Sequence, residues 1–412
     1  MRENTAASLA RRARGGDNAA SGASKSPAGL ETGMLEGIRV IELGNFITGP
    51  LAAMMLADLG AEVIKVERPE GDPFRRAFGA DYGPAFTAYN RNKKSVVLDT
   101  SKPEDKAALA ALVASADVLI DNFRPSALDR LGLGEPALRE KHPRLVHCSI
   151  TGFGNAGPYQ NRPAFDGVGQ AISGIASFLV DPQRPEAFGP TIADNATGMY
   201  AAYAVMGALI ERNRTGRGRR LEVNMLESSM AFIQDGFTTY TASGILGGRL
   251  TRIARSQAFT FRCADGKLIG THLSTGQKFW GELAKAAGAP ELIDDARFLT
   301  HQNRVANYEA LREILREKFL AKPRSEWLAI LDSHDVPVAP VHTVADALED
   351  PQVAALGTVL EMTHPARGAV RAIQCPVLSD GERPVTSPAP PPDLGEHTHS
   401  VLAELGIHRE TR

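Results

Sequence analysis

A strand–helix–strand pattern over residues 35–67 constrains the fold of this chain more than any other feature. Residues 38–43 predict a buried strand that stops at a glycine. Pro50 suits the first turn of a helix, where its missing N–H costs nothing, and Gly60 suits the left-handed C-cap of that helix. Residues 61–67 predict a second strand. Two strands joined by a helix within about thirty residues form the right-handed crossover of a parallel sheet.

The turn between this strand and helix argues against a nucleotide-binding unit. Glu67 ends the second strand, where an acidic residue holds the ribose in dinucleotide-binding proteins. The turn over 44–49, however, has neither the G-x-G-x-x-G pattern nor the Gly-Lys-Ser/Thr of a P-loop. The unit is therefore interpreted as a structural crossover in a doubly wound sheet.

Further strands and helices alternate along the chain. The strands are expected over 95–99, 118–120, 145–150 and 219–225, and the helices over 103–114 and 194–212. Such alternation predicts an α/β fold, with a Rossmann-like parallel sheet and function at the carboxyl ends of its strands.

The pattern changes after about residue 250. Residues 258–263 and 267–271 predict a hairpin around Asp265 and Gly266, with a type I′-like turn. Helices are expected from about Gln277, Tyr308 and Ser325, so this part predicts a smaller α+β domain. The predicted organisation is a large domain over 35–230, a small domain over 250–340 and a return to the large domain over 345–412.

Residues 1–34 differ in composition from the rest. They are rich in Ala, Ser, Gly and Arg and almost lack large apolar side chains, so we predict a disordered tail. The tail has no apolar core of a secretory signal. Met34, directly before the first strand, is a candidate start of the protein.

Charge and cysteine content exclude several classes of function. A formal net charge of −2 gives no general attraction for nucleic acid or for an anionic membrane, and no apolar run approaches the length of a membrane span. The three cysteines, Cys148, Cys263 and Cys375, have no metal or redox spacing. These features favour a cytoplasmic protein without nucleic-acid or membrane partners and without a metal site.

Eight segments, taken in order, resemble CoA-transferase family III, the group that includes formyl-CoA, carnitine and glutarate CoA-transferases. The resemblance begins at Leu35 and covers nearly all of the remaining chain. The segments are LEGIRVIELG, GPLAAMMLADLGAEVIKVERP, NRNKKSVVLD, NFRPSALDRLGLG, PRLVHCSITGFGNAGPY, RPAFDGVGQAISG, TGRGRRLEVNM and LGEHTHSVLAELG.

The resemblance implies an interlocked homodimer, in which each protomer forms a ring threaded through the other. It also implies an acyl-CoA and a small carboxylic acid as substrates, with no permanently bound cofactor. One feature of the sequence agrees with close protomer contact, because small residues line the helix that starts near Asp194. They are Ala201, Ala202, Ala204, Gly207 and Ala208.

The resemblance also implies which residues bind CoA. CoA carries a 3′-phosphate and a pyrophosphate, so its binding requires localised cations rather than a basic protein. Arg68, Arg124 and Arg130 stand at the family's CoA-contacting positions. The strand ends that line the adenine and ribose correspond to Leu98, Asp99, Thr100, Asn122 and Phe123.

The family's nucleophile is an aspartate, which corresponds best to Asp194. Its carboxylate attacks the acyl-CoA thioester to give a mixed anhydride and free CoA thiolate. The thiolate then attacks this anhydride, and an aspartyl-CoA thioester forms. A helix N-terminus would hold the charge of Asp194 and donate N–H groups to the anhydride. Asp181 and Asp166 remain alternative candidates for the nucleophile. A purely structural role for Asp194, as the N-cap of its helix, is the competing interpretation.

The sequence therefore predicts a CoA-transferase acting on a free carboxylic acid such as succinate or glutarate. A racemase or isomerase of the same family is disfavoured, because the racemases have a histidine where this chain has Phe165. Residues 272–277 stand in place of the glycine-rich loop of formyl-CoA transferase. An inactive CoA-binding protein, which would need the arginines but not the aspartate, is the alternative from another class.

Overall fold

The computed structural model describes residues 33–77, 82–124, 126–274, 276–385 and 387–408. The predicted tail therefore lies outside the described residues, apart from Gly33 and Met34. Those two residues belong to the fold, since a Cβ atom on Gly33 would lie only 2.6 Å from the Cα of Gly60. The N–H of Leu35 then donates to the carbonyl of Leu59 at 2.8 Å. The disorder of residues 1–32 stays a prediction.

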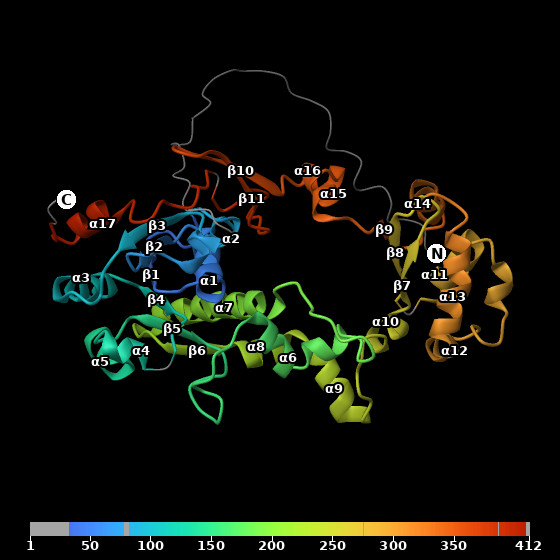
Figure 1. Cartoon of the computed structure of the whole chain (residues 1–412), viewed down its shortest axis with the longest axis horizontal. Helices are drawn as coiled ribbons and strands as arrows, with labels where there is room; N and C mark the ends of the chain where they lie inside the picture. The colour runs from blue at the N-terminus through green and yellow to red at the C-terminus, as the bar shows by residue number, and fades with distance from the viewer. Residues whose placement is uncertain (1–32, 78–81, 125, 275, 386, 409–412) are drawn as a thin grey trace, which may run out of the picture. The chain divides into compact units, whose positions relative to one another are not determined.

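Six parallel strands form the main sheet in the order β3-β2-β1-β4-β5-β6 (Figure 1). Their bounds are β1 Arg39–Glu42, β2 Glu62–Glu67, β3 Lys93–Val97, β4 Val118–Asp121, β5 Val146–Thr151 and β6 Arg220–Asn224. This is the order of a doubly wound Rossmann-type sheet, which confirms the predicted α/β class. Strand order reverses between β1 and β4, and ligands bind at that position in such sheets.

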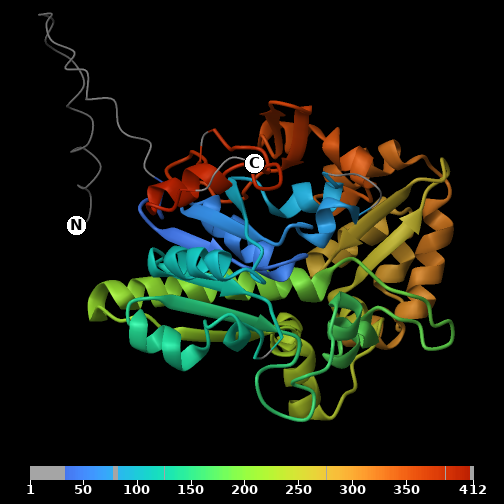
Figure 2. The same cartoon turned by 60° about the vertical axis from the view of Figure 1, so that its left-hand side comes forward.

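Helices cover both faces of this sheet. They are α1 Thr48–Ala57, α2 Pro84–Tyr89, α3 Pro103–Ala114, α4 Ala127–Arg130, α5 Glu135–Lys141, α6 Asp166–Ile172, α7 Ile192–Thr215, α8 Met225–Phe232 and α17 Thr398–Glu404. Alternate strand residues face opposite sides, so Val40 packs with α1 and α7 whereas Ile41 packs with α3 and α17. Both side chains are fully buried, as expected for a parallel sheet. Helix α7 is the long light-green helix in Figure 2.

The C-terminal segment closes one edge of the sheet. The N–H of Val97 in edge strand β3 donates to Thr398 Oγ1 at 3.0 Å, and His397 N–H donates to the carbonyl of Ser95 at 2.9 Å. Val401 and Leu402 of α17 join the hydrophobic cluster on one sheet face. This packing agrees with a chain that returns to the large domain, although the predicted boundary at 345 stays a prediction.

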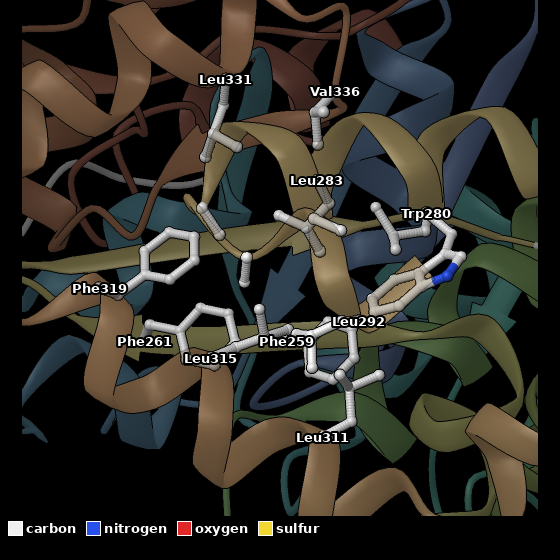
Figure 3. Packing of buried hydrophobic residues seen from close by; sticks show 14 of the residues in the cluster. Phe259, Phe261, Trp280, Leu283, Leu292, Leu311, Leu315, Phe319, Leu331 and Val336 are labelled. Atoms are coloured by element: carbon white, nitrogen blue, oxygen red, sulfur yellow. The ribbon is translucent and has the colours of Figure 1, made fainter. Parts of the chain in front are cut away.

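A second hydrophobic core lies around a three-stranded antiparallel sheet (Figure 3). The phenylalanine ring of Phe319 stacks between Phe261 and Trp327, with centroid distances of 4.4 and 4.5 Å. The elements are α10 Thr251–Ser256, β7 Ala258–Arg262, β8 Leu268–His272, α11 Gln277–Ala286, α12 His301–Ala306, α13 Tyr308–Phe319, α14 Arg324–Ser333 and β9 Val338–Pro340. All buried members of this core come from residues 254–336.

The hairpin of this small sheet has a different turn from the predicted one. A type I′ turn needs positive φ at both central residues, but in this turn only Gly266 has it, at 76°. Gly266 donates its N–H to the carbonyl of Cys263 at 2.9 Å. The connection is therefore a three-residue loop that ends in a glycine bulge, and the type I′ prediction is wrong.

The remaining elements connect these cores. They are α9 Gln234–Ser243, α15 Val344–Leu348, α16 Pro351–Ala355 and the antiparallel pair β10 Val359–His364 and β11 Gly368–Ile373, together with the short 3₁₀ turns Pro73–Arg75, Ile175–Phe178 and Pro290–Ile293. Within the described residues, every helix is too short or too polar to cross a bilayer.

Candidate active site

A cavity of about 250 Å³ lies where the strand order of the main sheet reverses. Its walls come from the turn between β1 and α1, the carboxyl ends of β4 and β5, and the following loop. The lining residues are 45–48, 122–124, 150–152, 160, 162–165, Asp194 and Met225. Four of the nine site residues predicted from sequence are therefore together: Asp194, Asn122, Phe123 and Arg124.

Asn122 holds the turn that forms one wall of this cavity. Its Oδ1 accepts the N–H of Asn45 at 2.9 Å, and its Nδ2 donates to the Asn45 carbonyl at 2.7 Å. Nδ2 also donates to Thr48 Oγ1 at 3.0 Å. The amide of Asn122 is thus occupied by the protein, which gives this residue a positioning role toward the turn.

Asp194 lies in the first turn of α7 and is only 9% exposed. Burial raises the pKa of its carboxyl group to about 7, and the nearby Asp166 carboxylate acts in the same direction. The sequence led us to expect a helix N-terminus that holds the charge, but desolvation outweighs it here. Within the described residues, the Asp194 carboxylate accepts no hydrogen bond from the protein. A carboxylate of this kind is poorly stabilised and basic.

Asp166 supports the start of α7 from the neighbouring helix α6. Its Oδ1 accepts the N–H of Asp194 at 3.2 Å, and its Oδ2 accepts from Gln170 Nε2 at 2.5 Å. Asp181 lies away from the cavity in an exposed loop, where it pairs with Arg249 at 3.3 Å. Asp194 is the one candidate aspartate of the three that lines the cavity, so the geometry favours it as the nucleophile.

The three predicted CoA-binding arginines occupy different positions. Arg124 lines the cavity and also a neighbouring cavity of about 210 Å³. Arg68 lies outside both cavities, with its Nε 3.7 Å from the carboxylate of Glu70. Arg130 is exposed at the end of α4 and also lies outside both. The structure thus brings one of the three arginines to Asp194.

The predicted residues after β3 lie apart from the cavity. In the sheet, β2 and β1 separate β3 from β4, which places the two strand ends roughly 14 Å apart at the usual strand spacing. Asp99 accepts the N–H of Ser101 at 3.1 Å, and Thr100 is half-buried. The Leu98 side chain is 1% exposed and packs in the core, so only its backbone is open to a ligand role.

Phe46 and Arg162 also line the cavity, and neither is among the site residues predicted from the sequence. Phe46 has a φ of 64°, which is unusual for a bulky residue and shows that the backbone of this turn is constrained. Its ring packs edge-on against Phe165, with centroids 5.8 Å apart. Arg162 lies in the loop before Phe165. Apolar residues do not recur at regular spacing in this loop, so no pattern marks its site residues. The one sequence signal for Arg162 is the RPAFD segment, which resembles the family.

A buried network of charges supports the turn from below. Lys65 Nζ donates to the Gly44 carbonyl at 2.7 Å and to Glu42 at 2.9 Å. Lys93 Nζ donates to the Pro50 carbonyl at 2.8 Å and to the other Glu42 oxygen at 2.8 Å. Both lysine side chains and the glutamate are 0% exposed. These bonds fix the backbone on both sides of the turn that lines the cavity.

Glu67 belongs to an adjacent buried pair and is not available to a ribose. Both of its carboxylate oxygens bind Arg75 at 2.7 Å, and Ser95 Oγ donates to one of them at 2.7 Å. The interpretation of this unit as a structural crossover is consistent with that pairing. Among the described residues, we find no group of three or more His, Cys, Asp or Glu side chains arranged to hold a metal.

Comparison with known proteins places this geometry in a family. The model of CoA-transferase family III matches residues 35–398. Succinyl-CoA:glutarate CoA-transferase of Mus musculus is 33% identical over 387 residues, which cover 90% of this chain and 86% of that protein. Succinate–glutarate CoA-transferase of Agrobacterium fabrum is 34% identical over 386 residues, which cover 90% of this chain and 95% of that one.

A solved structure agrees with the sequence match. The crystal structure of a CaiB/BaiF family protein from Brucella suis superposes with a TM-score of 0.81 at 34% identity, covering 91% of this chain and 100% of that chain. The α/β arrangement with a six-stranded parallel sheet and small antiparallel sheets is therefore shared. The chain belongs to CoA-transferase family III and is an enzyme of acyl-CoA metabolism.

Proposed function

We propose that this enzyme moves CoA from an acyl-CoA to a free dicarboxylic acid through a covalent intermediate on Asp194. The observation that carries the proposal is the position of Asp194, a desolvated carboxylate in the same cavity wall as Asn122, Phe123 and Arg124. Relatives named for transfer between succinyl-CoA and glutarate support the choice of acid.

The reaction conserves the activated acyl bond at each step. The Asp194 carboxylate attacks the thioester carbonyl, the C–S bond breaks, and a mixed anhydride and CoA thiolate result. The thiolate then attacks the aspartyl carbonyl, which releases the first acid and leaves a thioester on Asp194. The incoming carboxylate attacks this thioester, and the two steps run in reverse to give the new acyl-CoA and free Asp194.

Desolvation of Asp194 favours this chemistry. Its pKa of about 7 makes the ionised form a stronger base than a solvated aspartate, and nucleophilicity rises with basicity. The same desolvation requires that the proton leave before attack. Activity is therefore expected to rise with pH through the pKa of this group.

The composition of the cavity disfavours a racemase. A racemase needs an acid and a base on opposite sides of the α-carbon. Of the residues that line the described cavity, Asp194 is the one ordinary proton carrier, and Phe165 occupies the position of the racemase histidine. An inactive CoA-binding protein would have no need of a buried carboxylate at high desolvation cost, so the perturbed Asp194 favours an active enzyme.

We also propose a homodimer, and the surface of α7 supports it. Met199, Tyr203 and Ile210 are 54%, 71% and 73% exposed, and their spacing of four and seven residues puts them on one face. Of the small residues noted in the sequence, Ala201, Ala202 and Ala208 pack inside this chain, whereas Gly207 is exposed between Tyr203 and Ile210. The outward apolar stripe is thus the feature of α7 that favours a second copy. The interlocked topology and the cytoplasmic location stay predictions.

The proposed function is tested by trapping the intermediate. Enzyme incubated with succinyl-CoA and then with hydroxylamine should carry a stable hydroxamate on Asp194, located by peptide mass spectrometry. Formation of glutaryl-CoA from glutarate is measured in parallel. The Asp194→Asn variant should show neither product. A label on Asp181 or Asp166, or full activity of the Asn variant, would move the nucleophile to another residue.

A further inference from the structure

We propose that Arg162 binds the distal carboxylate of the dicarboxylic acid while the proximal carboxylate reacts at Asp194. This inference rests on the proposed function and identifies the residue that separates dicarboxylates from monocarboxylates. It starts from the lining of the catalytic cavity, which contains two guanidinium groups, Arg124 and Arg162, together with one carboxylate.

Arg162 is an exposed residue that stacks on an aromatic ring and, among the described residues, has no anionic partner. Its guanidinium lies over the ring of Tyr159, 4.0 Å from the centroid, and Tyr159 packs edge-on against Phe153 at 5.8 Å. Within the described residues, Arg162 forms no ion pair. An arginine that stacks on an aromatic ring keeps its planar edge free for a bidentate carboxylate. The site therefore offers a positioned cation for an anion from solution.

The distribution of polar groups in the cavity matches a short dicarboxylate. The apolar part of the wall consists of Phe46, Ile47, Phe165 and Met225. The charged side chains of Arg124, Arg162 and Asp194 line the same cavity. Phe165 is 62% exposed although it lines the cavity, so an apolar ligand segment can cover its ring. A volume of about 250 Å³ is below the range of sites for drug-sized ligands. Such a cavity suits a few methylene groups between two carboxylates.

Position separates the roles of the two arginines. Arg124 also lines the neighbouring cavity, which continues along β4 and β5 past Asp121 and Ser149. A residue shared between both spaces suits the long CoA moiety, which has to extend out of the catalytic cavity. Arg162, by contrast, lines the catalytic cavity and not the neighbouring one. It is therefore the cation left for the acid, whose distal carboxylate stays ionised and forms no bond during the exchange.

The test compares two acceptors that differ at the distal end only. Glutarate and its monoamide are offered to the enzyme with succinyl-CoA as donor. Because the acid meets an enzyme that already carries CoA, its kcat/KM does not depend on the donor. Arg162→Gln should lower kcat/KM for glutarate by about ten-fold to a hundred-fold and leave the value for the monoamide nearly unchanged. Arg162→Lys should recover part of the loss, since a point charge replaces a planar fork.

Arg124→Gln is the matched control and should lower kcat/KM for both acids by the same factor. If the monoamide is not turned over, its inhibition constant against glutarate replaces kcat/KM and should be the same in wild type and Arg162→Gln. Equal losses for both acids in Arg162→Gln, or no loss, would overturn the inference. So would a wild-type enzyme that treats the two acids alike while still making glutaryl-CoA. Failure of the wild type with every acid would instead reject the proposed function.

Discussion

Replacing the nucleophile by its neutral isostere should make this enzyme more stable while it abolishes activity. Asp194 has a pKa of about 7 in the folded chain against 3.8 for an unperturbed aspartate, because burial opposes its charge. An asparagine side chain at this position carries no charge but has nearly the same size, and the bond from the Asp194 N–H to Asp166 comes from the backbone. The Asp194→Asn variant thus removes the cost of ionisation alone.

The magnitude follows from the difference between the two pKa values. Between about pH 4 and pH 7 the folded state keeps a proton that the unfolded state has lost, so wild-type stability falls as pH rises through this range. About three units of pKa correspond to about 4 kcal/mol, which is an upper value because solvent reaches part of the group. The variant should therefore be more stable than wild type by up to about 4 kcal/mol above pH 8, with no difference below pH 4.

Urea unfolding followed by circular dichroism at about pH 4, 6 and 8.5 measures this difference, at one protein concentration because a dimer would couple stability to concentration. The control is Asp181→Asn, since Asp181 is an exposed partner of Arg249 and its loss should matter little. A variant less stable than wild type at alkaline pH, or a gain that does not depend on pH, would refute the reasoning. It would mean that the protein stabilises the Asp194 carboxylate in a way that the structure does not contain.

Three more predictions concern the site and the assembly. The kcat/KM of the wild type should rise with pH around pH 7, and Asp166→Asn should move the midpoint to lower pH, because the Asp166 charge raises the pKa of Asp194; a stopped-assay pH series measures both. Lys93→Met should cost about 1–3 kcal/mol in urea unfolding, because a Glu42 oxygen and the Pro50 carbonyl lose their buried donor while Lys65 still pairs with Glu42, whereas Lys94→Met, at a side chain 35% exposed, should cost less than about 1 kcal/mol. Mass photometry at nanomolar concentration should show twice the 44.1 kDa chain mass, and an active monomer there would reject the interlocked dimer.

The architecture of the sheet was predictable because local sequence determines it. Val40 and Ile41 are both apolar, which marks a strand buried on two faces, and the glycine and proline signals place the following helix. Parallel strands then bring their carboxyl ends to one edge, which is why Asn122 after β4 and Thr151 at the end of β5 meet in one cavity. Distances along that edge did not follow, so Asp99 was grouped with residues several strands away.

Side-chain pairing could not be predicted, because it depends on contacts between distant parts of the chain. Lys93 belongs to a run of basic residues that is typical of an exposed surface, yet it is buried against Glu42, fifty-one residues earlier. The stacking of Arg162 on Tyr159 and the positive φ of Phe46 likewise come from loops without a period. The pKa of Asp194 depends on how much of the chain covers it, which no motif records.

The covering of edge strand β3 by residues 395–398 has a consequence for synthesis on the ribosome. The first strands of the sheet leave the ribosome early, but Thr398, whose hydroxyl accepts the Val97 N–H, is made 301 residues after Val97. Until then the nascent sheet has an open edge, the kind of surface that pairs with other chains. We therefore expect a stop codon before residue 395 to leave β3 uncovered and to promote aggregation, even though Asp194 and the rest of the cavity wall would have been translated.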